Sequence, residues 1–360
     1  MEQIPQKRSL NYRGMSTDRN IEVEDITFHD PRKAPFRLYG LEPCGEGEAF
    51  RRMPWRVANE VSWKVYSLHS HTAGGRVRFR TDSDRVVIDV SYDLLEPRAC
   101  MSLLCSVGFD LYVEEDGKDV YYNDFLPPLD CEKGYRAQIS FSQRKMRTVT
   151  IYFPLYNDVK DLKIGLLKDA ALEEAPGYGD RLPLLFYGSS ITQGASVARP
   201  GLGYPARIAR ELRMDFRNLG FAGSCKGEPR MAEYLATQKS SAFILDYDHN
   251  SKDPEELAAT HYNVYRTYRD QNPETPIILV TRPACRPLGK AVQGRRRVVM
   301  ETYLRAVSEG DQNVWFVDGT SFLSMDDRFD GTVDGTHPND LGQHRMAAII
   351  GEVIASVLRR

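Results

Sequence analysis

Four short segments, far apart in the 360-residue chain, carry the residue types that acyl transfer by a serine enzyme requires. Residues 188–192 (GSSIT) offer a hydroxyl nucleophile at Ser190. Gly223 and Asn250 can present donors to a developing oxyanion. Residues 334–337 (DGTH) add a base with an orienting carboxylate. Each segment is weak evidence alone, but the ordered set predicts acyl transfer.

Each of these residues also has a simpler interpretation. Ser190 could cap a helix, Gly223 could be an ordinary loop turn, and Asn250 could be a hydrogen-bonding loop residue. Residues 188–192 do not form the G-x-S-x-G elbow of α/β-hydrolases, because Thr192 stands at the position of the second glycine.

The last segment favours the catalytic interpretation. Asp334 and His337 are three residues apart, so one turn of chain can fold the carboxylate onto the imidazole and fix its tautomer. A capping aspartate with a surface histidine is the alternative. His344 is the rival base, but it lies inside an expected helix without a carboxylate at this spacing.

From residue 184 onwards, short apolar strands alternate with helices. The expected strands span 184–187, 216–219, 242–245, 276–280 and 314–317, and the expected helices span 204–213, 229–238, 255–269, 295–308 and 341–358. This alternation predicts an α/β domain, a parallel sheet covered by helices on both faces. The four segments fall at the carboxyl ends of the strands, where such sheets bind ligands.

The first half of the chain has a period of two. Between residues 36 and 168, short runs of alternating apolar and polar residues are joined by turns, with no convincing helix. We therefore expect an antiparallel β-sandwich or jelly roll over 36–168. An irregular segment over 1–35 would precede it, and a linker over 169–182 would join it to a catalytic domain over 183–360.

The four segments resemble the blocks of the SGNH (GDSL-like) hydrolases. Residues 188–192 resemble the first block, 218–224 (NLGFAGS) the second, 248–251 (DHNS) the third and 334–337 the fourth. Residues 108–112 (GFDLY) resemble the Gly-x-Asp-Leu-Tyr motif of a β-rich domain that precedes a subset of these enzymes. The chain departs from the family pattern at Ser189, where aspartate is usual, and at Asp248 and Ser251.

The resemblance implies roles for five residues. Ser190 would be the nucleophile, His337 the general base and then acid, and Asp334 the residue that orients His337. The backbone N–H groups of Ser190 and Gly223 and the side-chain amide of Asn250 would form the oxyanion hole. No cofactor and no metal are implied.

Composition limits the partners. The formal net charge of −2 gives no electrostatic case for nucleic acid, and no apolar run approaches the length needed to span a membrane. The sequence starts without a signal peptide, so we expect a cytoplasmic protein, with a removed signal peptide as the alternative. Homo-oligomerisation stays open. The basic run 295–297 is expected on a solvated helix face.

The cysteines and histidines suggest no metal centre. The six cysteines are expected to be reduced, because the core is large and no C-x-x-C pair occurs. His69 and His71 could place two imidazoles on one face of a strand, but no third ligand lies near them in the sequence, so we expect a polar strand face.

Candidate substrate contacts are Trp55, Arg56, Tyr204 and Arg282. Trp63 is also aromatic, but it alternates with valines and is expected in the core. The leading hypothesis is a serine esterase that removes acetyl or another short acyl group, plausibly from a carbohydrate. The alternatives are an acyltransferase with the same triad and a non-catalytic carbohydrate-binding protein.

Overall fold

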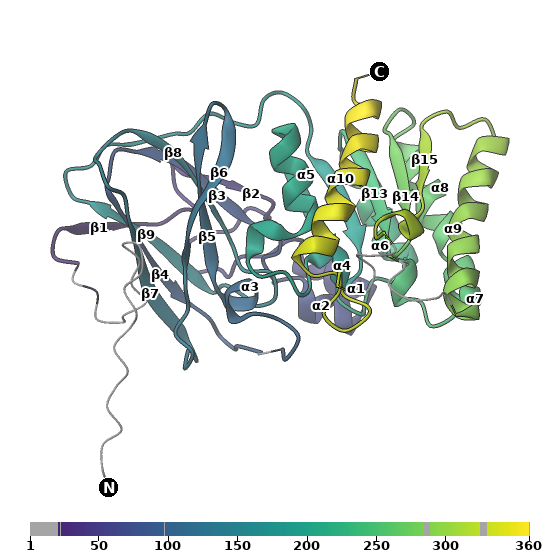
Figure 1. Ribbon diagram of the computed structural model, residues 1–360, viewed down its shortest axis with the longest axis horizontal. Helices are drawn as coiled ribbons and strands as arrows, with labels where there is room; N and C mark the ends of the chain where they lie inside the picture. The colour runs from purple at the N-terminus through teal and green to yellow at the C-terminus, as the bar shows by residue number, and fades with distance from the viewer. Residues whose placement is uncertain (1–20, 22, 97, 284–288, 325–329, 360) are drawn as a thin grey trace, which may run out of the picture.

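The computed structural model describes residues 21, 23–96, 98–283, 289–324 and 330–359. Most of the expected irregular N-terminal segment (residues 1–20) and Cys285 lie outside these ranges. Figure 1 shows two parts side by side, a β-rich part formed by the first half of the chain and an α/β part formed by the second half. Within the described residues, no helix is long and apolar enough to cross a membrane.

The α/β part is built on a five-stranded parallel sheet with the order β12-β11-β13-β14-β15. The strands are β11 (Leu184–Gly188), β12 (Phe216–Gly220), β13 (Ala242–Asp246), β14 (Ile277–Val280) and β15 (Val314–Val317). They agree closely with the strands expected from the apolar runs, and the predicted α/β fold is confirmed. β11 is the first strand of this sheet in the sequence and lies second from one edge. It pairs with β12 on one side and with β13 on the other.

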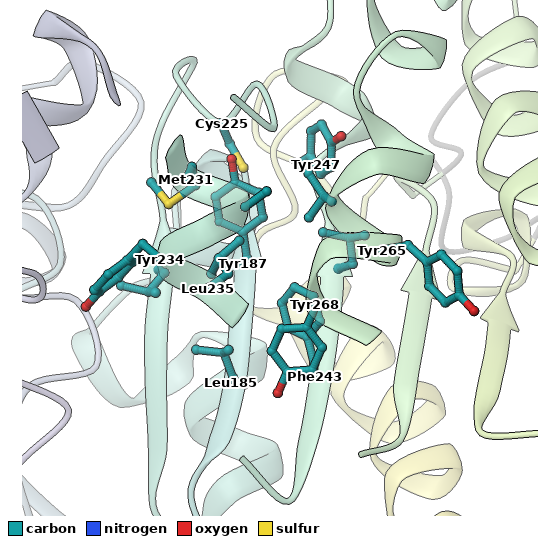
Figure 2. Packing of buried hydrophobic residues seen from close by; sticks show 14 of the residues in the cluster. Leu185, Tyr187, Cys225, Met231, Tyr234, Leu235, Phe243, Tyr247, Tyr265 and Tyr268 are labelled. Carbon is teal, nitrogen blue, oxygen red and sulfur yellow. The ribbon is translucent and has the colours of Figure 1, made fainter. Parts of the chain in front are cut away.

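Successive side chains of each strand point to opposite faces of this sheet, and each face has its own helices. Leu184 and Phe186 pack with helices α5 (Tyr204–Leu212) and α10 (Asp340–Val357). Leu185 and Tyr187 face the other side, where α6 (Pro229–Thr237), α8 (His261–Gln271) and α9 (Lys290–Ser308) complete a second core (Figure 2). The sheet is therefore buried on both faces, as its near-continuous apolar strands predict.

Two helices differ from their expected limits. The helix expected over 255–269 is divided into α7 (Pro254–Ala258) and α8, and the helix expected from residue 295 already begins at Lys290. Asp253 caps α7 through Glu256 N at 2.8 Å. Boundaries are the least defined part of a periodicity argument, because fraying and capping depend on neighbours that are remote in sequence.

The β-rich part contains two antiparallel sheets, as predicted. One has the order β1-β9-β4-β7 and the other β10-β3-β8-β5-β6, with β2 paired to β3. Their bounds are β1 (Ile26–His29), β2 (Arg37–Tyr39), β3 (Arg76–Thr81), β4 (Arg85–Ser91), β5 (Phe109–Glu115), β6 (Lys118–Phe125), β7 (Gly134–Ser140), β8 (Arg147–Tyr152), β9 (Asp161–Leu167) and β10 (Leu172–Glu173). The inward side chains of both sheets form one apolar core between them.

The expectation that residues 36–168 contain no helix is wrong. Helices α1 (Trp55–Val61), α2 (Trp63–Leu68) and α3 (Leu103–Val107) interrupt the strands. Ala58 on α1 and Val65 and Leu68 on α2 pack into the core of the α/β part. Trp63 lies two residues before the buried Val65 on α2, so it faces away from that core and is 74% exposed. Its apparent strand alternation was the misleading signal.

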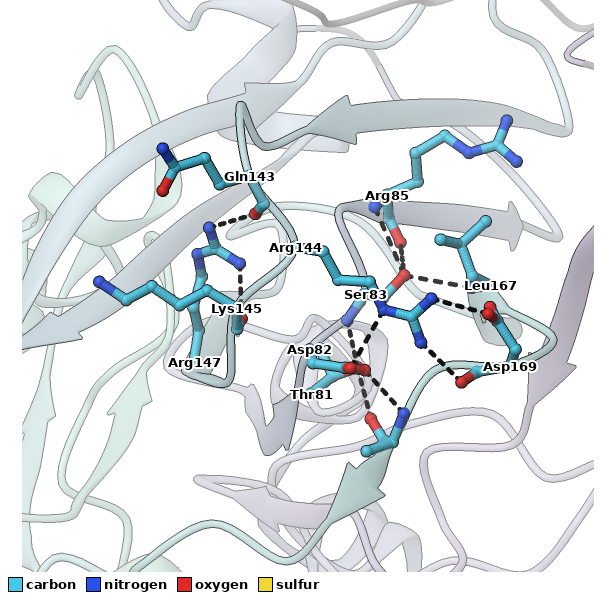
Figure 3. Close-up of polar contacts among 11 residues, drawn as sticks. Thr81, Asp82, Ser83, Arg85, Gln143, Arg144, Lys145, Arg147, Leu167 and Asp169 are labelled. Atoms are coloured by element: carbon cyan, nitrogen blue, oxygen red, sulfur yellow. Dashed lines mark hydrogen bonds and ion pairs between the residues drawn. The ribbon is translucent and has the colours of Figure 1, made fainter.

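Two segments expected to be irregular are paired. Ile26–His29 forms β1 at the edge of the first sheet, and Leu172–Glu173, in the expected linker, forms β10 against β3. Figure 3 shows the polar contacts that hold the start of the linker. Asp82 Oδ1 accepts the N–H of Ala171 at 2.7 Å, and Arg144 bridges Asp82 and Asp169.

The GFDLY segment joins the two parts of the chain. Asp110 is fully buried, and its Oδ2 accepts hydrogen bonds from Arg199 Nη1 at 2.8 Å and from Gly201 N at 2.9 Å. A side chain at Gly201 would lie 2.3 Å from Tyr112 Oη, so glycine is required for this approach. The segment therefore seats the loop that follows the nucleophile region on strand β5.

Candidate active site

Ser190 stands at a sharp turn where β11 ends and the short helix α4 (Ser190–Gln193) begins. A Cβ on Gly188 would lie 2.0 Å from Thr192 Oγ1 and 2.4 Å from Asp246 O, so only glycine allows the turn to be this tight. Ser189 caps α4 by accepting the N–H of Ile191 at 3.2 Å. Ser189, which stands where the family usually has aspartate, is thus the N-cap of α4.

Ser190, His337 and Asp334 form one continuous chain of hydrogen bonds. Ser190 Oγ lies 3.0 Å from His337 Nε2, and His337 Nδ1 lies 2.7 Å from Asp334 Oδ2. Although burial alone raises it, the pKa of Asp334 is held below its usual value by hydrogen bonds from the backbone N–H and imidazole of His337. The carboxylate is therefore ionised and fixes the proton of the imidazole on Nδ1, which leaves Nε2 free to accept the proton of Ser190.

The beginning of α10 sets the distance between His337 and Ser190. Asn339 caps this helix two residues after His337. Gln343, in its first turn, is fully buried; its Oε1 accepts the N–H of Tyr204 at 2.8 Å, and its Nε2 donates to Ile191 O at 3.2 Å. The helix that follows the histidine is thus fastened directly to the helix of the serine. Sequence reasoning missed Gln343, because a polar residue in a helix gives no sign that it is buried.

Gly223 lies in a turn beside the nucleophile. Ser224 N donates to Phe221 O at 2.9 Å, and Gly223, with φ of +67°, occupies the third position of this turn. It is exposed, and among the described residues its N–H has no acceptor. The N–H of Ser190, at the first position of α4, also has no acceptor among the described residues.

Asn250 belongs to the 3₁₀ turn η2 (Asp248–Asn250), which follows strand β13. Its Nδ2 donates to Phe221 O at 3.1 Å, so one amide hydrogen holds the Gly223 turn. The second amide hydrogen has no acceptor among the described residues. The structure thus brings three free N–H groups, from Ser190, Gly223 and Asn250, to the carboxyl edge of neighbouring strands.

A buried carboxyl group lies beneath the nucleophile. Asp246 Oδ2 accepts hydrogen bonds from Thr192 Oγ1 and Tyr204 Oη, both at 2.9 Å. Burial raises the pKa of Asp246 to about 7. The interpretation of Tyr204 as a substrate contact is wrong, because its side chain is fully buried in this group. Tyr204 supports α4 from below.

Two arginines contact η2 and the residues that follow it, Arg282 through its backbone and Arg295 through its side chain. Asp248, at the position where the family usually has glycine, is buried and accepts the N–H of Arg282 at 3.2 Å. Burial raises the pKa of Asp248 to about 6. Arg295, expected on a solvated face, is in fact buried, and its Nη1 donates to Ser251 O and Lys252 O, each at 3.3 Å. The departure at Asp248 therefore creates a link between η2 and the loop after β14.

His249 was not singled out in the sequence, yet it lies beside the triad. Burial, assisted by the positive charge of Arg282, lowers the pKa of His249 to about 3. The imidazole is therefore neutral, and its Nδ1 is buried without a hydrogen-bond partner among the described residues. Arg282, a predicted substrate contact, is close enough to His249 for its charge to lower the pKa of that imidazole.

The remaining candidates are outside the hydrogen-bonded triad. Trp55 is 47% exposed on α1, and the guanidinium of Arg56 lies 5.3 Å from its ring centroid. Neither residue contacts the triad among the contacts of the described residues. His344 is exposed on α10 and borders a groove with α5, which leaves His337 as the histidine at Ser190.

The two histidines considered for a metal have other contacts. His69 Nδ1 lies 2.5 Å from Tyr66 O, and His71 Nδ1 lies 3.1 Å from Gln193 Nε2. Both are buried outside regular strands, so the expected strand face is wrong. The described part of the chain contains no group of three or more His, Cys, Asp or Glu side chains that could hold a metal ion. Four of its described cysteines, Cys44, Cys100, Cys105 and Cys225, are free thiols.

Fold and site together define a serine hydrolase of the α/β class. Comparisons with known proteins make this specific. Residues 181–355 match the GDSL-like lipase/acylhydrolase family, and residues 26–172 match the GxDLY family, described as the N-terminus of SGNH-hydrolase-type esterases. Among curated proteins, none matches the sequence.

Solved structures resemble the whole chain. A Bacteroides ovatus protein described as a GDSL-like lipase is 30% identical, with a TM-score of 0.84 over 93% of this chain and 98% of its own. The salicylyl-acyltransferase SsfX3 of a tetracycline biosynthetic pathway is 20% identical, with a TM-score of 0.76 over 93% and 98%. A family two carbohydrate esterase from Clostridium thermocellum is 15% identical, with a TM-score of 0.61 over 90% and 99%.

The chain belongs to the GDSL-like lipase/acylhydrolase family and is an SGNH-type serine hydrolase. The resemblance inferred from the four segments and from the GFDLY segment is confirmed. The interpretation as a non-catalytic carbohydrate-binding protein has no support in this assignment.

Proposed function

We propose that this hydrolase removes short acyl groups, acetyl above all, from hydroxyl groups of a carbohydrate. The observation that supports the chemistry is the chain of hydrogen bonds from Asp334 through His337 to Ser190. Ser190 Oγ attacks the ester carbonyl while His337 Nε2 takes its proton, and the C–O bond to the sugar breaks as His337 returns that proton to the leaving alcohol. Water then attacks the acyl-enzyme by the same route in reverse.

The oxyanion that forms at each attack is stabilised by neutral donors. The N–H groups of Ser190 and Gly223 and the free amide hydrogen of Asn250 supply them, and none needs to break a protein hydrogen bond first. Donors that are already in place do not have to reorganise during the reaction. We assign the oxyanion hole to these three residues.

The carbohydrate part of the proposal is supported by exposed aromatic surface on α1. Trp55 offers a ring on which a sugar can stack, with Arg56 beside it. Structural similarity to carbohydrate esterases agrees with this choice. If α1 binds sugar, Trp55→Ala raises KM for an acetylated oligosaccharide several-fold and leaves p-nitrophenyl acetate unaffected. An equal effect on both substrates would contradict this role.

The reaction itself is tested with wild type and Ser190→Ala on p-nitrophenyl acetate, followed by acyl chains of increasing length. We expect hydrolysis by wild type, a preference for short chains, and no activity in the variant. Activity near that of wild type in Ser190→Ala would refute the assignment, and a maximum at eight or more acyl carbons would refute the short-chain preference.

Acyl transfer to an alcohol is the second candidate. The structural similarity to SsfX3, an acyltransferase, supports it, and the same triad serves both reactions, since only the acceptor differs. A panel of acetylated saccharides and short acyl esters, assayed for released acid and for transfer product together, separates the two. Dominant transfer product would favour the acyltransferase.

A further inference from the structure

Gln193, three residues after the nucleophile, is fully buried and uses every polar hydrogen and its carbonyl oxygen. Its Oε1 accepts the N–H of Ala222 at 3.0 Å. Its Nε2 donates to Leu155 O at 2.9 Å and lies 3.1 Å from His71 Nδ1. The amide orientation is unambiguous, because Ala222 N can only donate and Leu155 O can only accept.

The three partners belong to different parts of the molecule. Ala222 directly precedes Gly223 in the turn that presents an oxyanion donor, whereas His71 and Leu155 come from the first half of the chain. That half also contributes Tyr156, whose Oη donates to Ser190 O at 3.0 Å. Gln193 therefore links the β-rich part directly to the residue before Gly223.

The geometry points to a positioning role, and we propose that Gln193 fixes the Gly223 turn in the orientation that stabilises the oxyanion. Other contacts hold the residues on either side of Ala222. Phe221 is held through its own N–H, which donates to Gly188 O at 2.8 Å, and through its O, which accepts from Asn250. Ala222 N is bonded only to Gln193 among the described residues, so this contact orients the peptide that directly precedes the one carrying the Gly223 N–H. The Gly223 peptide itself is contacted through Ala222 O, which accepts from Ser224 Oγ at 3.2 Å.

This inference rests on the proposed esterase chemistry but predicts a separate effect. Replacing Gln193 by methionine keeps the volume and removes both the acceptor for Ala222 N and the donor to Leu155 O. A shift of about 1 Å in a reacting group can cost on the order of 100-fold in rate. We therefore expect kcat on p-nitrophenyl acetate to fall about 10- to 100-fold while KM changes less than about threefold, because the turn acts on the transition state.

Gln193→Glu supplies a rescue with its own pH signature. A protonated carboxyl group accepts from Ala222 N through its C=O and donates to Leu155 O through its O–H, so it reproduces both contacts. An ionised carboxylate has no hydrogen for Leu155 O. The ratio of kcat for this variant to kcat for wild type should fall as pH rises from 5.5 to 8.

The control separates positioning from general loss of stability. Ile164→Val removes one methylene from the sandwich core, far from the Gly223 turn in the fold. Its Tm should fall while its kcat stays within about twofold of that of wild type. If Gln193→Met matched the control in kcat, or if the ratio for Gln193→Glu were independent of pH, the proposal would be wrong.

Amide hydrogen exchange gives a measurement that does not depend on esterase activity. In wild type the Ala222 N–H is protected by Gln193, and in Gln193→Met its exchange should accelerate at least tenfold. The exchange of the Gly194 N–H, which caps the end of α4 through Ser190 O, should be unchanged. Unchanged protection of Ala222 would overturn the proposal even if the natural substrate were of another class. Loss of activity in Ser190→Ala tests the proposed function alone.

Discussion

Asp334 and His337 are joined twice. One carboxylate oxygen, Oδ1, accepts the backbone N–H of His337 at 2.8 Å, and the other, Oδ2, lies 2.7 Å from Nδ1 of the same residue. The first bond sets the position of the carboxylate, and the second sets the tautomer of the imidazole. Because Gly335 adopts a φ of +80°, the chain between them can close this short loop.

Asp334→Asn should therefore lower kcat on p-nitrophenyl acetate by about 10³- to 10⁴-fold. The asparagine amide can donate to Nδ1, which places the imidazole proton on Nε2 and prevents this atom from accepting the proton of Ser190. Steady-state kinetics at pH 8 measures the effect. Asp330→Asn makes the same chemical change at an exposed position nearby and should stay within threefold of wild type. Equal rates for the two variants would contradict the orienting role.

Asn250→Ala tests the third oxyanion donor. Losing one donor typically costs about 10²- to 10³-fold in turnover, and we expect kcat to fall by that amount with little change in KM. Asn250→Asp should fall further, because a carboxylate would repel the oxyanion. Asn59→Ala, an exposed asparagine on α1, is the matched control. A kcat of Asn250→Ala within threefold of wild type would remove Asn250 from the oxyanion hole.

Asp110→Ala tests the joint between the two parts. Removing this buried carboxylate leaves Arg199 and the N–H of Gly201 without their partner, so the free energy of unfolding should fall by about 3 kcal/mol. Urea unfolding followed by tryptophan fluorescence measures the change. Asp93→Ala breaks an exposed ion pair with Lys160 and should cost less than about 1 kcal/mol. Similar losses would show that Asp110 has no special structural role.

The strands of the α/β part and the order of the four segments could be predicted, because both depend on local runs of residues. Leu184–Gly188 is apolar throughout, and the sharp turn at Ser190 follows from Gly188. Placement at the carboxyl ends of parallel strands then follows from topology. The fold and the family could therefore be predicted without knowing which residues meet across long sequence separations.

Other features depend on contacts between residues far apart in sequence, and these were missed or misread. Tyr204 gives the same signal whether it faces a substrate or is buried against Asp246, which is 42 residues away. Gln193 resembles any polar helix residue until its partners Ala222 and Leu155 are in place. Trp63 is exposed and not in the core, because its alternation with Val61 and Val65 is too short to distinguish a strand from the ends of two helices.

Asp246→Asn should change how stability depends on pH. Between its usual pKa near 3.8 and its raised value of about 7, the folded carboxyl group keeps a proton that the unfolded one has lost. Unfolding therefore releases a proton in this window, so the free energy of unfolding falls as pH rises through it and levels off above about pH 7. The fall from pH 5 to 8 due to this group is about 3 kcal/mol. Asparagine cannot ionise, and its amide oxygen can still accept from Thr192 or Tyr204.

Urea unfolding of both proteins at pH 5 and pH 8 measures this difference directly. Relative to wild type, Asp246→Asn should gain about 3 kcal/mol between the two pH values, because only wild type loses stability through this carboxyl group. Other groups that titrate in the window, including Asp248, are present in both proteins and largely cancel in the comparison. Asp180→Asn, at an exposed position, should follow wild type. Parallel pH dependences for wild type and Asp246→Asn would show that the carboxyl group beneath the nucleophile is ionised throughout this range.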